Sequence, residues 1–214
     1  LAWVENVLQP ALNLDIIVKE ESHNPSGISR FFEHEHEEAP VAYEFLHDRL
    51  REAAYSLMSD QEKKLAHYRA GRIIYKKAGA LSREELFGMV AHLNYSADLL
   101  TDEKERIELA EYNLAAAEKA KLSNAHTSAL KYLKAGISLL PKDSWKRFYR
   151  LTFDLYKEYY WCMFTCSGFF AAEPIFQLIM EKVRHNSDKV EISFRKTILC
   201  TGYYKPEEAI SAGL

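Results

Sequence analysis

The sequence predicts a mostly α-helical fold in which a short strand-containing module precedes a stack of helical hairpins. Only 8 Gly and 6 Pro occur in 214 residues, whereas β-sandwiches and barrels use many such turn residues. From Leu46 onward, apolar residues recur every three or four positions, the spacing of a helix that buries one face. Hydrophobic residues make up 48% of the chain, which is enough material for a folded core.

The N-terminal part predicts a helix and two strands. Residues 1–12 have helical spacing, residues 14–18 are short and β-branched, and residues 41–45 alternate apolar and polar side chains. The intervening residues 19–40 are polar and read as a loop. A helix followed by two strands and a long loop resembles the end of a winged-helix domain, so we assign residues 1–58 to a winged-helix remnant.

The remaining chain, residues 59–214, predicts successive helices. Ser59 with Glu62, and Ser82 with Glu85, have the spacing of a capping box, in which the Ser oxygen and the Glu carboxylate each accept a backbone N–H. Asp102 and Ser123 mark two further helix starts. The helices follow one another through short connections.

Small and apolar residues repeat along this helical part. Ala129, Leu133, Gly136 and Pro141 have the offsets of the second helix of a tetratricopeptide repeat, where small residues let two helices approach. Ala117 and Ala120 take the matching positions of the first helix. Further units are indicated by Gly168-Phe169 with Ala172, Phe176 and Ile179, and by Gly202-Tyr203 with Ala209. The units are longer than the standard ~34 residues, so we predict a degenerate tetratricopeptide-like solenoid.

Charge and cysteine content restrict the function classes. The net charge is −3 and no basic cluster stands out, which disfavours a nucleic-acid surface. Three cysteines without a secretory signal indicate a reducing, cytoplasmic compartment. Cys162 and Cys166 share one helix face and are interpreted as small apolar residues rather than metal ligands. No apolar run approaches the ~20 residues that span a bilayer.

The string Phe45-Leu46-His47-Asp48-Arg49 lies where the second strand passes into a helix. It resembles the methionine-histidine-aspartate motif of signal-transduction ATPases with numerous domains, the STAND class. In that family the histidine contacts the β-phosphate of bound ADP and holds the inactive state. The resemblance implies that His47 is the nucleotide sensor and that Asp48 braces the local turn. The alternative is that His47 is a polar residue at a helix start.

Further segments look like the ATPase-to-repeat part of very large signalling kinases, which combine serine/threonine kinase-like, AAA-type ATPase, GAF and histidine-kinase domains. These segments are Ala91–Asn94, Ala97–Asp102, Ala129–Gly136 and Leu139–Pro141. The acidic, His-rich residues 33–38 and Lys205-Pro206 depart from the pattern. The resemblance implies ATP or ADP and Mg²⁺ in the intact protein, and neighbouring nucleotide-binding and kinase domains as partners.

This chain itself is expected to be non-enzymatic and to bind no cofactor. None of its glycines is followed by Lys, so it has no G-x-x-x-x-G-K-[ST] phosphate loop. No paired carboxylates, nucleophile elbow or Cys/His pair stands out. His34 and His36 among glutamates could hold a metal in a hydrolase, but no third ligand is obvious and a solvated loop is the preferred interpretation.

One predicted helix is rich in aromatic residues and carries two adjacent apolar stripes. The stripe that contains Tyr149, Phe153, Tyr156 and Tyr160 is a candidate partner or dimer surface. Core packing is the preferred interpretation.

Together, the features predict a regulatory, non-catalytic segment whose repeats bind a protein or small effector and signal to an adjacent ATPase. The alternative is a winged-helix transcription regulator with a repeat effector domain, for which residues 46–57 supply only Arg49 and Arg51 as basic contacts.

Overall fold

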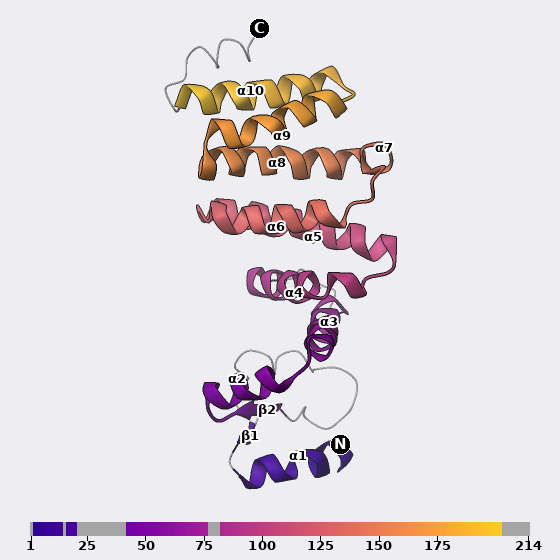
Figure 1. Ribbon diagram of the computed structural model, residues 1–214, viewed down its shortest axis with the longest axis vertical. Coiled ribbons are helices and arrows are strands. Elements are labelled where there is room, and N and C mark those ends of the chain that lie inside the picture. The colour runs from indigo at the N-terminus through magenta and orange to yellow at the C-terminus, as the bar shows by residue number, and fades with distance from the viewer. Residues whose placement is uncertain (1, 15, 21–41, 77–81, 203–214) are drawn as a thin grey trace. The chain divides into compact units, whose positions relative to one another are not determined.

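The computed structural model describes residues 2–14, 16–20, 42–76 and 82–202 and is mostly helical (Figure 1). The chain divides into two compact units, Leu1–Ala80 and Leu81–Leu214. The boundary expected after residue 58 stays a prediction. Within the first unit, Tyr55 Oη lies 3.0 Å from His67 Nε2 and the two rings meet edge to face.

The first unit contains the expected strand pair. Its elements are α1 (Ala2–Asn13), β1 (Ile17–Glu20), β2 (Ala42–Phe45), α2 (Asp48–Leu57) and α3 (Asp60–Lys76). The two strands pair antiparallel, with Ile17 opposite Phe45 and Glu20 opposite Ala42. The Leu46 N–H donates to the Ile16 carbonyl at 3.1 Å, which extends the pairing towards the start of α2.

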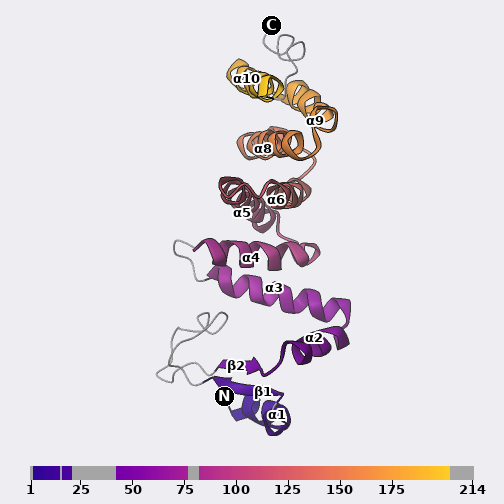
Figure 2. The same cartoon turned by 90° about the vertical axis from the view of Figure 1, so that its left-hand side faces the viewer.

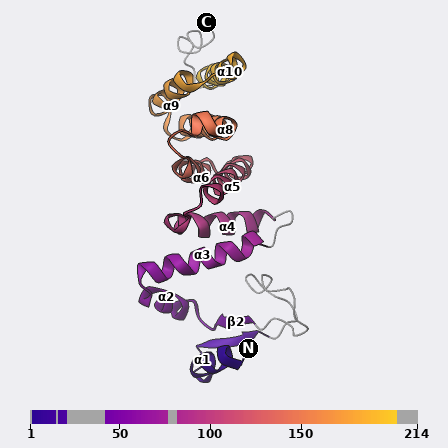
Figure 3. The same cartoon turned by 90° about the vertical axis from the view of Figure 1, so that its right-hand side faces the viewer.

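The second unit contains helices only, among the residues that the structure describes. They are α4 (Arg83–Tyr95), the 3₁₀ turn η2 (Ala97–Leu99), α5 (Glu103–Leu122), α6 (His126–Leu139), α7 (Ser144–Arg147), α8 (Tyr149–Ser167), α9 (Phe169–Lys182) and α10 (Asn186–Gly202). α5 packs against α6, and α8 packs against α6 and α9. Figures 2 and 3 show α5, α8 and α10 in one layer and α6 and α9 in the other.

The predicted helix starts are confirmed except one. Ser59 Oγ accepts the Glu62 N–H at 3.3 Å, and Ser82 with Glu85 forms a complete capping box. The Asp102 carboxylate accepts the Lys104 N–H at 3.0 Å at the start of α5. The start predicted at Ser123 is wrong. Its N–H bonds back to the Ala120 carbonyl at 3.1 Å, so Ser123 follows the end of α5, and α6 begins at His126.

Small residues bring the helices together where the repeat pattern predicted. Ala117, Ala120, Ala129 and Leu133 are buried, and Gly136 lies at the contact of α5, α6 and α8. A Cβ atom at Gly136 would lie 3.0 Å from Leu155 Cδ2 and 3.1 Å from Asn113 Cβ. α6 therefore approaches its neighbours closely because residue 136 has no side chain.

α8 and α9 form a hairpin. The chain reverses at Gly168, whose φ of +84° suits glycine. Ala172, Phe176 and Ile179 of α9 then pack into a buried cluster with Phe153, Tyr160 and Phe164 of α8 and with Ile192 and Leu199 of α10. Residues 203–214, including Tyr203 and Ala209 of the expected third unit, lie outside the described residues.

Candidate partner-binding groove

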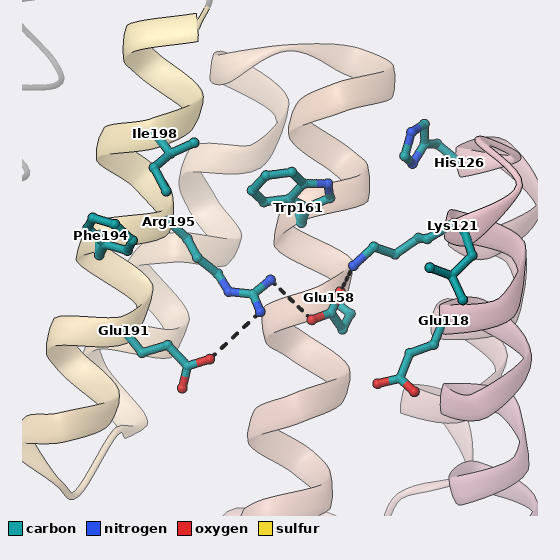
Figure 4. Close-up of a pocket in the computed structure, with 10 residues that line it drawn as sticks. Glu118, Lys121, His126, Glu158, Trp161, Glu191, Phe194, Arg195 and Ile198 are labelled. Carbon is teal, nitrogen blue, oxygen red and sulfur yellow. Dashed lines mark hydrogen bonds and ion pairs between the residues drawn. The ribbon is translucent and has the colours of Figure 1, made fainter.

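The layer formed by α5, α8 and α10 is hollowed into a groove of about 750 Å³. This volume falls within the range of ligand-binding clefts. Each of the three helices contributes to its walls, and His126 at the start of α6 lies at one end (Figure 4). The lining residues are Glu118, Lys121, Leu122, His126, Glu158, Trp161, Glu191, Phe194, Arg195 and Ile198.

Charged side chains join the three helices across the floor of the groove. The Glu158 carboxylate, on α8, lies between Lys121 of α5 and Arg195 of α10, and it pairs with both (Figure 4). The Arg195 Nη1 to Glu158 Oε1 distance is 3.1 Å. Arg195 also lies 3.7 Å from Glu191, and Lys157 Nζ lies 2.9 Å from Glu191. We call Lys121, Lys157, Glu158, Glu191 and Arg195 the ion network.

Burial makes this ion network a structural element rather than a set of surface pairs. The side chains of Glu158 and Lys157 are 7% and 8% exposed. A buried charge is tolerated only when partners compensate for its lost hydration. Since the partners of Glu158 come from two other helices, its carboxylate ties α5 and α10 to α8.

The indole of Trp161 lies in the middle of the groove, and two cations of the network approach its ring. Lys121 Nζ lies 5.8 Å from the ring centroid, and the Arg195 guanidinium carbon lies 5.9 Å from it. Both distances suit cation–π attraction. The cations therefore hold the aromatic ring in place while they pair with Glu158.

The rim of the groove is apolar and accessible. Leu122 is 87% exposed and Phe194 is 63% exposed. Ile198 lies on the same rim of α10 as Phe194 (Figure 4). The two cations of the floor already face carboxylates, so an anionic ligand would have to displace Glu158. The geometry instead suits contact with apolar side chains, with polar groups at the edges.

Comparison with known proteins shows one similarity, to a signalling kinase. The chain is 24% identical over 181 residues to Hybrid signal transduction histidine kinase G of Dictyostelium discoideum. The match covers 73% of this chain and 5% of that protein. The chain thus spans about one twentieth of the length of this curated relative. No family model and no solved structure matches it. The similarity links the chain to signalling kinases and goes no further.

The groove residues were not predicted from the sequence. A usable signal was present, because Lys157 and Glu158 are adjacent charged residues in the middle of a helix that is rich in aromatic and apolar residues. Charged residues that lie between two apolar stripes of a helix require charged or polar partners from neighbouring helices. The sequence pattern does not say which helices supply them, since Lys121 and Arg195 lie far away along the chain.

The four residues suggested as a partner surface lie mainly in the core. Phe153 and Tyr160 are 0% exposed, so the partner-surface interpretation is wrong for these two, and core packing holds. Burial also raises the pKa of the Tyr160 phenol. Tyr149 and Tyr156 are half-buried. Tyr149 Oη donates to Asp188 at 2.6 Å, which ties α8 to α10.

His47 and Asp48 are exposed at the start of α2. His47 has the extended backbone of a residue that precedes a helix, and its side chain makes no capping hydrogen bond. The Asp48 carboxylate lies 3.0 Å from Arg51 Nη2. An exposed imidazole is available to a ligand from another domain. The sensor role itself stays a prediction.

The three cysteines differ in burial, which determines the reactivity of their thiols. Cys162 and Cys200 are buried and Cys166 is exposed, and all three are free thiols. Burial raises the pKa of Cys162 to about 11, so it is an unreactive apolar residue. His34 and His36 lie outside the described residues. Within the described ranges, no three His, Cys, Asp or Glu side chains gather as metal ligands.

Transmembrane segments were searched over the same part of the chain. Among the helices from α1 to α10 as the structure describes them, none is both long and apolar enough to cross a bilayer.

Proposed function

We propose that this chain is a non-catalytic regulatory segment of a multidomain signalling protein, and that its groove binds a partner. The observation that carries the proposal is the ion network, which fixes three helices around one accessible apolar-rimmed groove. The similarity to a signal transduction histidine kinase supports a signalling setting. A protein segment is the occupant that fits best, since the rim offers apolar area and the floor offers no unpaired cation.

The helical part is proposed to be a tetratricopeptide-like solenoid. Support comes from the two successive hairpins, α5 with α6 and α8 with α9, and from the small residues at their contacts. Ala129 and Gly136 are buried at the positions where such repeats need close approach. In arrays of this kind each hairpin contacts only its neighbours, so a small tilt at one contact is passed along the stack.

The first unit is proposed to be the end of a winged-helix domain that adjoins a nucleotide-binding domain. The helix, strand pair and following helix support this assignment. His47 would contact the β-phosphate of ADP, with Mg²⁺ and the phosphate loop supplied by the neighbouring domain. Such coupling makes groove occupancy and nucleotide state mutually dependent, because allosteric coupling between two binding sites is reciprocal.

The ion network gives the groove a way to report its occupancy. A partner that separates α5 from α10 must stretch the contacts of Lys121 and Arg195 with Glu158, whereas a partner that bridges them keeps these contacts. The arrangement of helices is therefore linked to binding by paired charges that are expensive to separate. A kinase domain joined to the array would sense this change.

The proposal is tested in the longer protein that contains this chain, by measuring autophosphorylation of its kinase domains. Leu122→Asp changes an 87% exposed groove residue, and the matched control Phe170→Asp changes an 82% exposed residue of α9. Neither substitution should affect folding, since both side chains face solvent. We expect Leu122→Asp to alter autophosphorylation several-fold and Phe170→Asp to leave it unchanged. Equal activities for both variants and the wild type would reject the groove as the regulatory site.

A further inference from the structure

Three charged residues mark the middle of the groove. Lys121, Glu158 and Arg195 are spaced by 37 residues each, and one lies on each of α5, α8 and α10. Because Glu158 pairs with both cations, the three side chains lie at one level of the three helices (Figure 4). In that view the groove residues that precede this level along the chain lie below it, and Trp161 and Ile198, which follow it, lie above (Figure 4). The two ends of the groove therefore consist of different residues.

The end that precedes this level is acidic. Glu118 comes one helical turn before Lys121 on α5, and Glu191 lies at the same end on α10 (Figure 4). The Glu191 carboxylate is compensated, because Lys157 Nζ lies 2.9 Å away and Arg195 lies 3.7 Å away. Glu118 is exposed, and no cation pairs with it among the residues that the structure describes. This acidic end thus offers one uncompensated carboxylate to a ligand.

The opposite end is apolar. Trp161 and Ile198 each come three residues after the charged residue of their own helix, on the far side of the ion network from the two carboxylates (Figure 4). Ile198 is 45% exposed, and Leu122 of α5 is 87% exposed. Accessible apolar area of this kind favours contact with apolar side chains of a partner.

A partner segment gains at both ends only if its side chains have the complementary order. A Lys or Arg beside Glu118 would form a new ion pair without breaking the ion network, whereas an acidic side chain there would meet two carboxylates. Such complementarity determines which partners associate and in which orientation. The acidic and apolar ends of α10 are separated by the seven residues from Glu191 to Ile198, or about 10 Å of helix. One short segment can therefore contact both ends.

We propose that the groove binds a basic and apolar protein segment in one direction, with Lys or Arg at Glu118 and apolar side chains at Trp161. The inference rests on the proposed function, to which it adds the chemistry of the partner and its orientation. Acidic segments are excluded by the same arrangement, because their carboxylates would face Glu118 and Glu191.

The test begins with a selection of short random peptides, displayed on phage, against the chain 1–214. Selected peptides that no longer bind Leu122→Asp occupy the groove, and we expect them to combine apolar residues with Lys or Arg at one end. Groove-binding peptides without a basic residue would overturn this inference and leave the proposed function standing. If no selected peptide lost its binding to Leu122→Asp, the groove would not be a binding site, and the proposed function would fail together with this inference.

Charge reversal then locates the basic residue of the bound peptide. Glu118→Lys should raise the Kd of the groove-binding peptides about tenfold at low ionic strength, because an attraction becomes a repulsion. Glu181→Lys is the matched control, since it makes the same change in net charge at a 69% exposed side chain of α9. The control should change the Kd by less than about twofold. Equal effects of the two substitutions would show that only net charge matters and would overturn the inference.

The direction of binding is tested with a second form of one selected peptide, in which the basic residues are moved to the opposite end and the composition is unchanged. We expect the wild-type chain to bind this form about tenfold more weakly, and Glu118→Lys to bind the two forms about equally. Equal affinity of the wild-type chain for both forms would contradict a fixed direction.

Discussion

The substitution Glu158→Gln should destabilise the helical unit, because it removes one negative charge from the centre of the ion network. The Gln side chain keeps nearly the same volume, so packing is preserved and the electrostatic contribution is isolated. The side chains of Lys121 and Arg195 are 22% and 25% exposed, so both cations would stay largely out of water. Arg195 keeps Glu191 as a partner, whereas Lys121 would lose its paired carboxylate.

The expected cost follows from this arrangement. Removal of one member of a fully buried ion pair costs about 3–5 kcal/mol. The partial exposure of the two cations and the remaining Arg195 pair reduce this figure, and we expect about 2 kcal/mol. For a chain of this size, that loss corresponds to a fall in Tm of about 4–8 °C.

Thermal and urea unfolding followed by circular dichroism measure the effect. Glu103→Gln is the matched control, because Glu103 pairs with Arg147 while both side chains are 47% exposed. Exposed pairs contribute little to stability, so the control should produce a clearly smaller change in Tm. Equal changes for Glu158→Gln and Glu103→Gln would refute the view that the network is a buried connection between helices.

Three further predictions concern packing, thiol chemistry and the nucleotide sensor. Gly136→Val should lower the free energy of unfolding by about 1–3 kcal/mol, measured by urea unfolding, because even a Cβ there would lie 3.0 Å from Leu155; unchanged stability would contradict the close packing. In iodoacetamide labelling at pH 8, Cys166 should react first, since the pKa of Cys162 is raised to about 11 and its thiolate is scarce; mass spectrometry would show the reverse order if burial were misassigned. In the longer protein, His47→Ala should speed ADP release several-fold without changing the Tm, and unchanged release would count against the sensor role.

Much of the fold could be predicted from the sequence because its determinants are local. Capping at Ser82 and Asp102 depends on side chains within three residues of the helix start. Gly136 marks a position where even a Cβ atom would lie close to its neighbours, and Ala129 is fully buried. Ser123 was misread because a Ser can precede a helix or follow one, and the left-handed backbone of Asn124, with φ of 55°, decides between the two.

The groove could not be predicted in the same way, because its residues converge from separate helices. Glu158 by itself is a polar residue in an aromatic helix, and its role depends on Lys121 and Arg195, which the stacking of α5, α8 and α10 brings beside it. Phe153 and Tyr160 show the converse. Their aromatic side chains would fit a binding surface or a core equally well, and they are buried because residues of α9 and α10 pack into the same cluster.

The central claim is that regulation acts through the groove layer of the helical unit, and amide hydrogen exchange on the longer protein tests it most directly. Exchange would be compared between the resting and the signalling-active forms. The account predicts that protection changes at the C-terminal half of α5, around Trp161 of α8 and along residues 191–198 of α10, while α6 and α9 keep theirs. A change confined to α6 and α9, or identical exchange in both forms throughout the helical unit, would contradict it.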